Sequence, residues 1–93
     1  MGTARQRSER LAEKLLQIRL ELGLSQSEML SRLDVGEMIV YNRISDYETG
    51  KREPPLPILL RYARVVGICV EILIDDALDL PTKLPSRTKH KLS

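Results

Sequence analysis

The apolar residues of this chain recur at spacings of three and four, which is the period of an α-helix. The first such set consists of Leu11, Leu15, Ile18 and Leu22. Gly23 follows directly, and glycine readily adopts the left-handed backbone conformation that ends a helix. The pattern therefore predicts a helix over residues 11–22 with one face turned to a core.

A second helix is expected to begin after Ser25 and to run to about Leu33. Ser25 and Glu28 have the Ser-x-x-Glu spacing of a capping box, in which each side chain accepts a hydrogen bond from the backbone N–H of the other residue. Only a turn of two or three residues then separates the first two helices.

A third helix is predicted over about residues 41–49. Its apolar stripe consists of Val40, Ile44 and Tyr47, and Gly50 ends it. On a helical wheel the polar side chains of Asn42, Asp46 and Thr49 lie opposite that stripe, with Arg43 and Ser45 on its flanks. The sequence thus predicts two short helices, the second with a polar outer face.

Two more helices complete the prediction. Three prolines make residues 51–57 an irregular connection. A fourth helix is marked by Leu59, Tyr62, Ala63 and Val66 and closed by Gly67, and a fifth runs from Val70 to about Leu78. The fold class is therefore all-α, a compact five-helix domain over residues 1–79. Residues 80–93 are rich in Pro, Thr, Ser and Lys, and we expect a flexible basic tail.

Composition narrows the class of protein further. The 93 residues suffice for one domain, and the absence of Phe and Trp makes the core aliphatic. The single Cys excludes an internal disulfide, and no apolar run is long enough for a membrane span. The polar residues after Met1 do not resemble a secretory signal. These features favour a cytoplasmic location.

The net charge of +2 does not by itself indicate a nucleic-acid partner. Four basic residues lie in 82–93 without any acid, which leaves 11 of the 15 basic residues against 13 acidic ones in the rest of the chain. Attraction to phosphates must therefore come from local patches. Asp75, Asp76 and Asp79 stand at the unfavourable end of the fifth helix for its dipole, and we expect them to serve solubility.

The pattern from Gly23 to Pro54 resembles a known family. Gly23-Leu24-Ser25-Gln26, followed by the stretch from Ile44 to Arg52 and by Pro54, is similar to the lambda-repressor-like helix-turn-helix family, also called the XRE family. The resemblance spans about residues 11–74. It implies a DNA-binding domain that lays its third helix in the major groove of a duplex.

The resemblance also implies roles for single residues. Gln26 matches the glutamine that opens the family's second helix and contacts the DNA backbone. Arg19 and Glu48 match an ion pair that joins the first helix to the recognition helix. Lys51 and Arg52, just past the recognition helix, are expected to bind phosphates, although each can equally be a solvated loop residue.

The candidates for base reading are Tyr41, Asn42, Arg43 and Asp46. Asn can pair with adenine through two hydrogen bonds, Arg can do so with guanine, and Asp can accept from cytosine. Each can instead be a solvated surface residue, and Arg43 and Asp46 can pair with each other at their spacing of three.

The chain departs from the family in the turn before the recognition helix. The connection is about four residues longer than the family pattern, and about 3.6 residues make one helical turn. Leu30 stands where the family usually has Ala, so we expect a wider helix crossing that the longer connection permits. Residues 37–40 form either a loop or an added turn of the recognition helix, and we expect the loop because an added turn would carry Glu37 toward phosphates.

The sequence thus favours a small transcriptional regulator that binds double-stranded DNA, without enzymatic activity, metal or cofactor. Neither His90 nor Cys69 has a partner for metal binding or catalysis, and Cys69 is expected to be a small core residue. The alternative is a protein-interaction module, an adaptor or antitoxin-like partner with the same fold, which the acidic body favours.

A homodimer is expected if the protein binds a two-fold operator. The residues that can form its interface are Ile72, Leu73, Leu78 and Leu80, which can equally seal the core of one copy.

Overall fold

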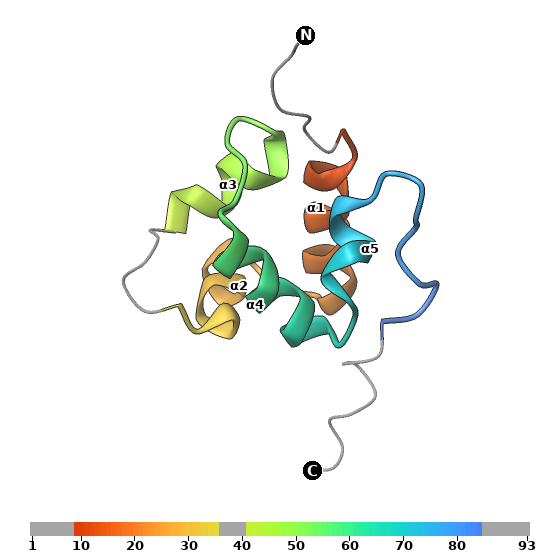
Figure 1. Cartoon of the computed structure of the whole chain (residues 1–93). Helices are drawn as coiled ribbons and strands as arrows, with labels where there is room; N and C mark the ends of the chain where they lie inside the picture. Colours follow the sequence, from red (N-terminus) through yellow and green to blue (C-terminus); the bar gives the residue numbers. More distant parts are fainter. Residues whose placement is uncertain (1–8, 36–40, 85–93) are drawn as a thin grey trace, which may run out of the picture.

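The computed structural model describes residues 9–35 and 41–84 of the chain. Within them it contains five helices and no strand: α1 (Leu11–Leu22), α2 (Gln26–Leu33), α3 (Tyr41–Thr49), α4 (Leu56–Val66) and α5 (Val70–Ile74). Figure 1 shows α1 beside α5 on one side of the molecule, and α2 and α3 on the other. The all-helical prediction is confirmed.

The turn between α1 and α2 is built as its sequence predicts. Gly23 has a φ of 72°, and the N–H groups of Gly23 and Leu24 donate to the carbonyls of Leu20 and Arg19, which satisfies two carbonyls at the end of α1. The Ser25 hydroxyl then accepts from the Glu28 N–H at 3.1 Å, while the Glu28 carboxylate accepts from the Ser25 N–H at 2.7 Å. Both helix ends are therefore fixed by residues adjacent in sequence.

The core is aliphatic except for two tyrosines. Its side chains with no exposed surface come from all five helices and are Leu15, Ile18, Met29, Ile44, Ile58, Tyr62, Val66 and Leu73. Leu30, the residue that replaces the family's Ala, is half-buried and packs against this core. The apolar stripes predicted from the sequence thus meet in one cluster.

Two helix boundaries differ from the prediction. The fourth helix begins at Leu56, so Pro57 lies in its first turn, where a residue without an N–H is tolerated. The fifth helix ends at Ile74 rather than near Leu78, because Asp75 is extended and its carboxylate accepts a hydrogen bond from the N–H of Ala77. Cys69 precedes α5 with an exposed side chain, so its expected place in the core was wrong.

The segment after α5 packs against the core. Leu84 is 1% exposed, and Leu80 is partly buried against the same cluster. The packed part of the chain therefore extends beyond residue 79, where we expected the domain to end. Residues 85–93, the rest of the expected tail, lie outside the described residues.

A buried lysine joins α1 to the end of α5. The Lys14 side chain is 1% exposed, and its ammonium donates to the carbonyls of Ile72 and Asp75 at 2.7 and 3.0 Å. These carbonyls lie at the C-terminal end of α5, where a cation is favourable for the helix dipole. Burial, together with the charge of Arg10, lowers the pKa of Lys14.

The acidic residues after α5 also hold the two ends of the domain together. The Asp76 carboxylate accepts from the N–H groups of Glu9 and Arg10 at 2.8 and 3.1 Å, directly before α1. The Asp79 carboxylate accepts from the Arg10 guanidinium at 2.7 Å. The expectation that these acids serve only solubility was therefore wrong: Asp76 is at the unfavourable end of its own helix but at the favourable end of α1.

Acid should weaken this junction. The N–H groups of Glu9 and Arg10 lower the pKa of Asp76 below its ordinary value of 3.8, so the folded state binds its proton less tightly than the unfolded state does. The stabilisation by Asp76 is then present above pH 3.8 and is lost as the pH falls through the lowered pKa. We expect Asp76→Asn to reduce the free energy of unfolding at pH 7 and to flatten its dependence on pH in acid.

Urea unfolding followed by circular dichroism between pH 2 and pH 7 measures this effect. Asp34→Asn is the matched control, because the Asp34 side chain is 89% exposed. Equal acid dependence in the wild type and in Asp76→Asn would contradict the assignment.

Candidate nucleic-acid interface

The helices α2 and α3 form the two halves of a helix-turn-helix (Figure 1). The inner side of α3 is fixed in the core by Ile44, which has no exposed surface, and by Tyr47, which is 3% exposed. Since these residues occupy one stripe of the helix, the opposite stripe faces away from the core. A helix held in this way can present side chains to a partner without rearrangement.

An ion pair fixes α3 to α1. The Arg19 guanidinium donates to both carboxylate oxygens of Glu48, from Nε at 2.7 Å and from Nη2 at 3.0 Å. The side chains are only 14% and 3% exposed, and Arg19 also donates to the carbonyl of Leu24 at 2.9 Å. The hydrogen bonds that Arg19 donates to the Glu48 carboxylate raise the pKa of Arg19. One arginine thus ties α1, the turn after it and the recognition helix together.

Gln26 is the first residue of α2, as the resemblance implies. Its side-chain amide donates to the Glu48 carboxylate at 3.3 Å, which places it at the junction of α2 and α3. An amide group has two N–H donors, so the second one can serve another acceptor. The N-terminal end of α2 also favours an anion. Gln26 can therefore connect a phosphate to the network that holds the recognition helix.

The outward side of α3 carries the polar residues expected there. Asn42 and Thr49 are exposed. The Arg43 and Asp46 side chains are 35% and 21% exposed, and they pair with each other at 3.5 Å. Both readings of these two residues thus have a structural basis: they lie on the candidate reading surface, and they also contact each other.

Asp46 contacts a second arginine that the sequence analysis did not connect with it. Its carboxylate lies 3.2 Å from Nε of Arg52, beyond the end of α3. The chain turns back at Gly50, whose φ of 82° suits glycine, and the N–H groups of Lys51 and Arg52 donate to the Asp46 carbonyl. The glycine after the helix was the available signal for this reversal.

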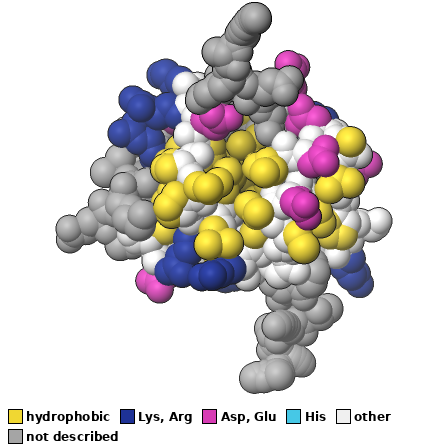
Figure 2. All heavy atoms as spheres, viewed as in Figure 1, with side chains coloured by type: hydrophobic (Ala, Val, Ile, Leu, Met, Phe, Trp, Pro, Cys, Tyr) yellow, Lys and Arg dark blue, Asp and Glu magenta, His cyan; other side chains and the backbone are white. Residues whose placement is uncertain are grey.

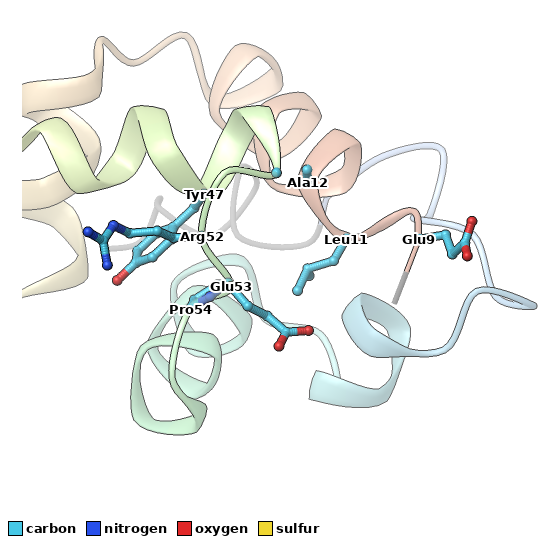
Figure 3. A pocket seen from close by; sticks show the side chains of 8 residues that line it. Glu9, Leu11, Ala12, Tyr47, Arg52, Glu53 and Pro54 are labelled. Atoms are coloured by element: carbon cyan, nitrogen blue, oxygen red, sulfur yellow. The ribbon is translucent and has the colours of Figure 1, made fainter. Parts of the chain in front are cut away.

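Lys51 and Arg52 are exposed at the C-terminal end of α3. Arg52 forms part of the wall of a shallow pocket between α3 and the start of α1, together with Tyr47 and Leu11. Figure 3 shows the Arg52 side chain extending along Tyr47, whereas Glu53 points away from it. The guanidinium therefore remains accessible beside the reading surface.

Charge is distributed unevenly over the surface. Figure 2 shows one group of Lys and Arg side chains beside α3 and another lower on the molecule, near α2 and α4, whereas Asp and Glu side chains gather mainly on the side of α1 and α5. The acids identified on that side, Asp76 and Asp79, are those that hold the start of α1. One of the basic groups on this face thus lies beside α3, which the overall composition could not reveal.

Some predicted features lie outside the described residues. These are the side chain of Tyr41, residues 37–40, for which we expected a loop rather than an added helical turn, and His90. Among the residues of the predicted dimer surface, Leu73 belongs to the core and Leu78 is 39% exposed.

Residues 9–35 and 41–84 contain no cluster of three or more His, Cys, Asp or Glu side chains that could hold a metal ion. None of the helices in these ranges has the length and apolar character required to cross a membrane.

Comparison with known proteins identifies the motif. A family model described as helix-turn-helix matches residues 15–69, which is more than half of the chain. No curated protein and no solved structure matches the chain significantly. The matched range contains α2, α3, the Arg19–Glu48 pair and the exposed Lys51 and Arg52.

Proposed function

The chain belongs to the lambda-repressor-like helix-turn-helix family of DNA-binding domains, and from this we propose that it is a small transcriptional regulator that binds double-stranded DNA sequence-specifically and has no enzymatic activity. In this proposal α3 enters the major groove. Arg43 and Asn42 are the base-reading candidates that its outward surface offers, since their side chains can pair with guanine and adenine.

The observation that carries this proposal is the way α3 is held. Its inner side chains are buried, and the Arg19–Glu48 pair fixes it to α1 by two hydrogen bonds. A reading helix must keep its donors and acceptors in a fixed register with the base edges, and a helix fixed on its inner side does so.

Contacts to the DNA backbone are proposed for both ends of the motif. Gln26 lies at the N-terminal end of α2, and Lys51 and Arg52 lie exposed just after α3. Cations and helix N-termini bind phosphates without regard to sequence and fix the orientation of the protein on the duplex.

We further propose that the protein acts as a dimer on a two-fold operator. Two copies can reach half-sites about one helical turn of DNA apart, and a single domain of this size buries little surface on DNA. Leu78 and Ile74, each 39% exposed near the end of α5, are the apolar residues available there for contact between copies. Sedimentation equilibrium with and without duplex tests this part separately.

The alternative function is binding of another protein through the same fold. Leu56 and Leu60 favour it, because they lie one turn apart on α4 and are 68% and 41% exposed. An adaptor or antitoxin-like partner would use such a surface without contacting bases.

A salt titration of binding to duplex DNA tests the proposed function. We expect binding to random duplex at low salt, with an affinity that falls steeply as salt increases because counterions are released from the DNA. Lys51→Ala should weaken binding to all sequences alike and should reduce the steepness of the plot of log K against log salt by about 1. Absence of duplex binding at every salt concentration would instead favour the protein-interaction module.

Lys83→Ala is the matched control for this titration. Lys83 is also an exposed lysine, but it lies in the segment after α5 rather than beside α3. We expect its replacement to leave the salt dependence unchanged. Selection of bound duplexes from a random pool then supplies the preferred sequence.

A further inference from the structure

One carboxylate on the recognition helix serves two arginines. The Asp46 Oδ2 atom lies 3.5 Å from Arg43 Nη1 and 3.2 Å from Arg52 Nε. Arg43 stands one turn earlier on α3, whereas Arg52 follows the chain reversal at Gly50. Asp46 therefore connects a base-reading candidate with a phosphate-binding candidate.

The carboxylate is less exposed than either of the two arginine side chains. The Asp46 side chain is 21% exposed, against 35% for Arg43 and 57% for Arg52. A guanidinium has five N–H donors, so each arginine keeps free donors while one of its nitrogens contacts Asp46. The two positively charged side chains are thus more accessible to a partner than the negatively charged one.

The backbone of Asp46 restrains the same unit. Its carbonyl accepts from the N–H groups of Lys51 and Arg52 at 2.9 and 3.2 Å, and from the Thr49 hydroxyl at 3.3 Å. Arg52 is consequently held at its backbone and at its side chain by one residue. Burial raises the pKa of Tyr47, and the charges of Arg43, Arg52 and Asp46 act on the same hydroxyl.

These contacts argue against direct reading of a cytosine by Asp46. The carboxylate already lies within ion-pair distance of two guanidinium groups and is the least exposed of the three side chains. Without those cations an anion at this position would be repelled by the phosphates on either side of the groove.

We infer that Asp46 is a positioning residue that orients Arg43 toward a base and Arg52 toward the phosphate backbone. The inference rests on the proposed function. It replaces the base-reading role suggested for Asp46 by its sequence position, and it makes base preference at one base pair depend on a residue that does not touch the base. Through Asp46, the contact of Arg52 with the DNA backbone is also coupled to the contact of Arg43 with the base.

The first test requires no DNA. We expect Asp46→Ala to release Arg52, so that the ¹⁵N heteronuclear NOE of its Nε–H falls and the exchange of that proton with water accelerates. Asp46→Asn keeps the shape of the side chain without its charge and should give an intermediate result. Unchanged NOE and exchange in Asp46→Ala would overturn the positioning role.

The second test compares binding to the selected duplex and to random duplex. We expect Asp46→Ala to weaken binding to random duplex modestly, because Arg52 loses its orientation toward the phosphate backbone, and to weaken binding to the selected duplex more. Discrimination should therefore fall about tenfold, at the base pair whose preference is also lost in Arg43→Ala. The double variant Arg43→Ala/Asp46→Ala should discriminate between the selected and the random duplex no worse than Arg43→Ala alone. Asp34→Asn is the control, because Asp34 pairs with Arg61 on α4 instead.

Loss of preference at a different base pair, or unchanged discrimination, would overturn the inference and leave the proposed function in place. Failure of the wild-type protein to bind any duplex would overturn both. The first test distinguishes these cases, since it reports on the contacts of Asp46 in the free protein.

Discussion

Replacing Glu48 by alanine should lower the free energy of unfolding by about 3 to 5 kcal/mol, because the guanidinium of Arg19 would remain in a mostly buried site without its carboxylate. The Glu48 side chain is 3% exposed and accepts two hydrogen bonds from Arg19 and one from Gln26. A charge left in such a place loses its partner and gains little water in return.

Urea unfolding at pH 7, followed by circular dichroism, measures this loss. The double variant Arg19→Met/Glu48→Leu should recover most of it, because an apolar pair of similar volume needs no partner for a buried charge. Glu13→Ala serves as the control, since Glu13 pairs with Arg10 at the surface and is 65% exposed, and a far smaller loss is expected. A loss below about 1 kcal/mol for Glu48→Ala would show that water reaches the pair freely.

The Glu48→Ala variant should also lose affinity for DNA, and this loss can be measured separately from its loss of stability. The pair holds α3 to α1, so binding to the selected duplex should weaken even at temperatures where the variant remains folded. The double variant restores packing but not the fixed hydrogen-bond geometry of the pair, and we expect it to recover stability more completely than sequence discrimination.

Replacing Lys14 by methionine should lower the free energy of unfolding by about 1 to 3 kcal/mol. Methionine fills most of the space of the lysine stem, but it leaves the carbonyls of Ile72 and Asp75 without the donor that contacts them at 2.7 and 3.0 Å. Lys14→Ala should cost more, because it also leaves a cavity beside α5.

The same unfolding measurement applies, with Arg64→Met as the matched control. Arg64 is an exposed cation on α4, and its replacement is expected to change stability by no more than about 0.5 kcal/mol. Equal or greater stability of Lys14→Met would mean that the carbonyls at the end of α5 find water as readily as they find the ammonium.

Local signals determined the end of α1 and the start of α2. Gly23, Ser25 and Glu28 act on backbone groups no more than five residues away, so their roles can be read directly from the sequence. The apolar stripes likewise predicted which sides of the helices are buried, because helical spacing alone places them on one face. For the candidate site, the resemblance to a family located the Arg19–Glu48 pair, which no local pattern predicts.

Contacts between distant segments were decided only by the tertiary structure. Lysine is usually a surface residue, and an acid such as Asp76 is unfavourable at the end of its own helix. Both residues have their partners only because α5 packs against α1 in the folded structure. Asp46 reached Arg52 only because the chain reverses at Gly50. Packing of the apolar faces fixes the positions of the helices, and those positions decide which charged side chains meet. The spacing of apolar residues along the sequence does not reveal these pairs, because the hydrophobic effect is non-directional.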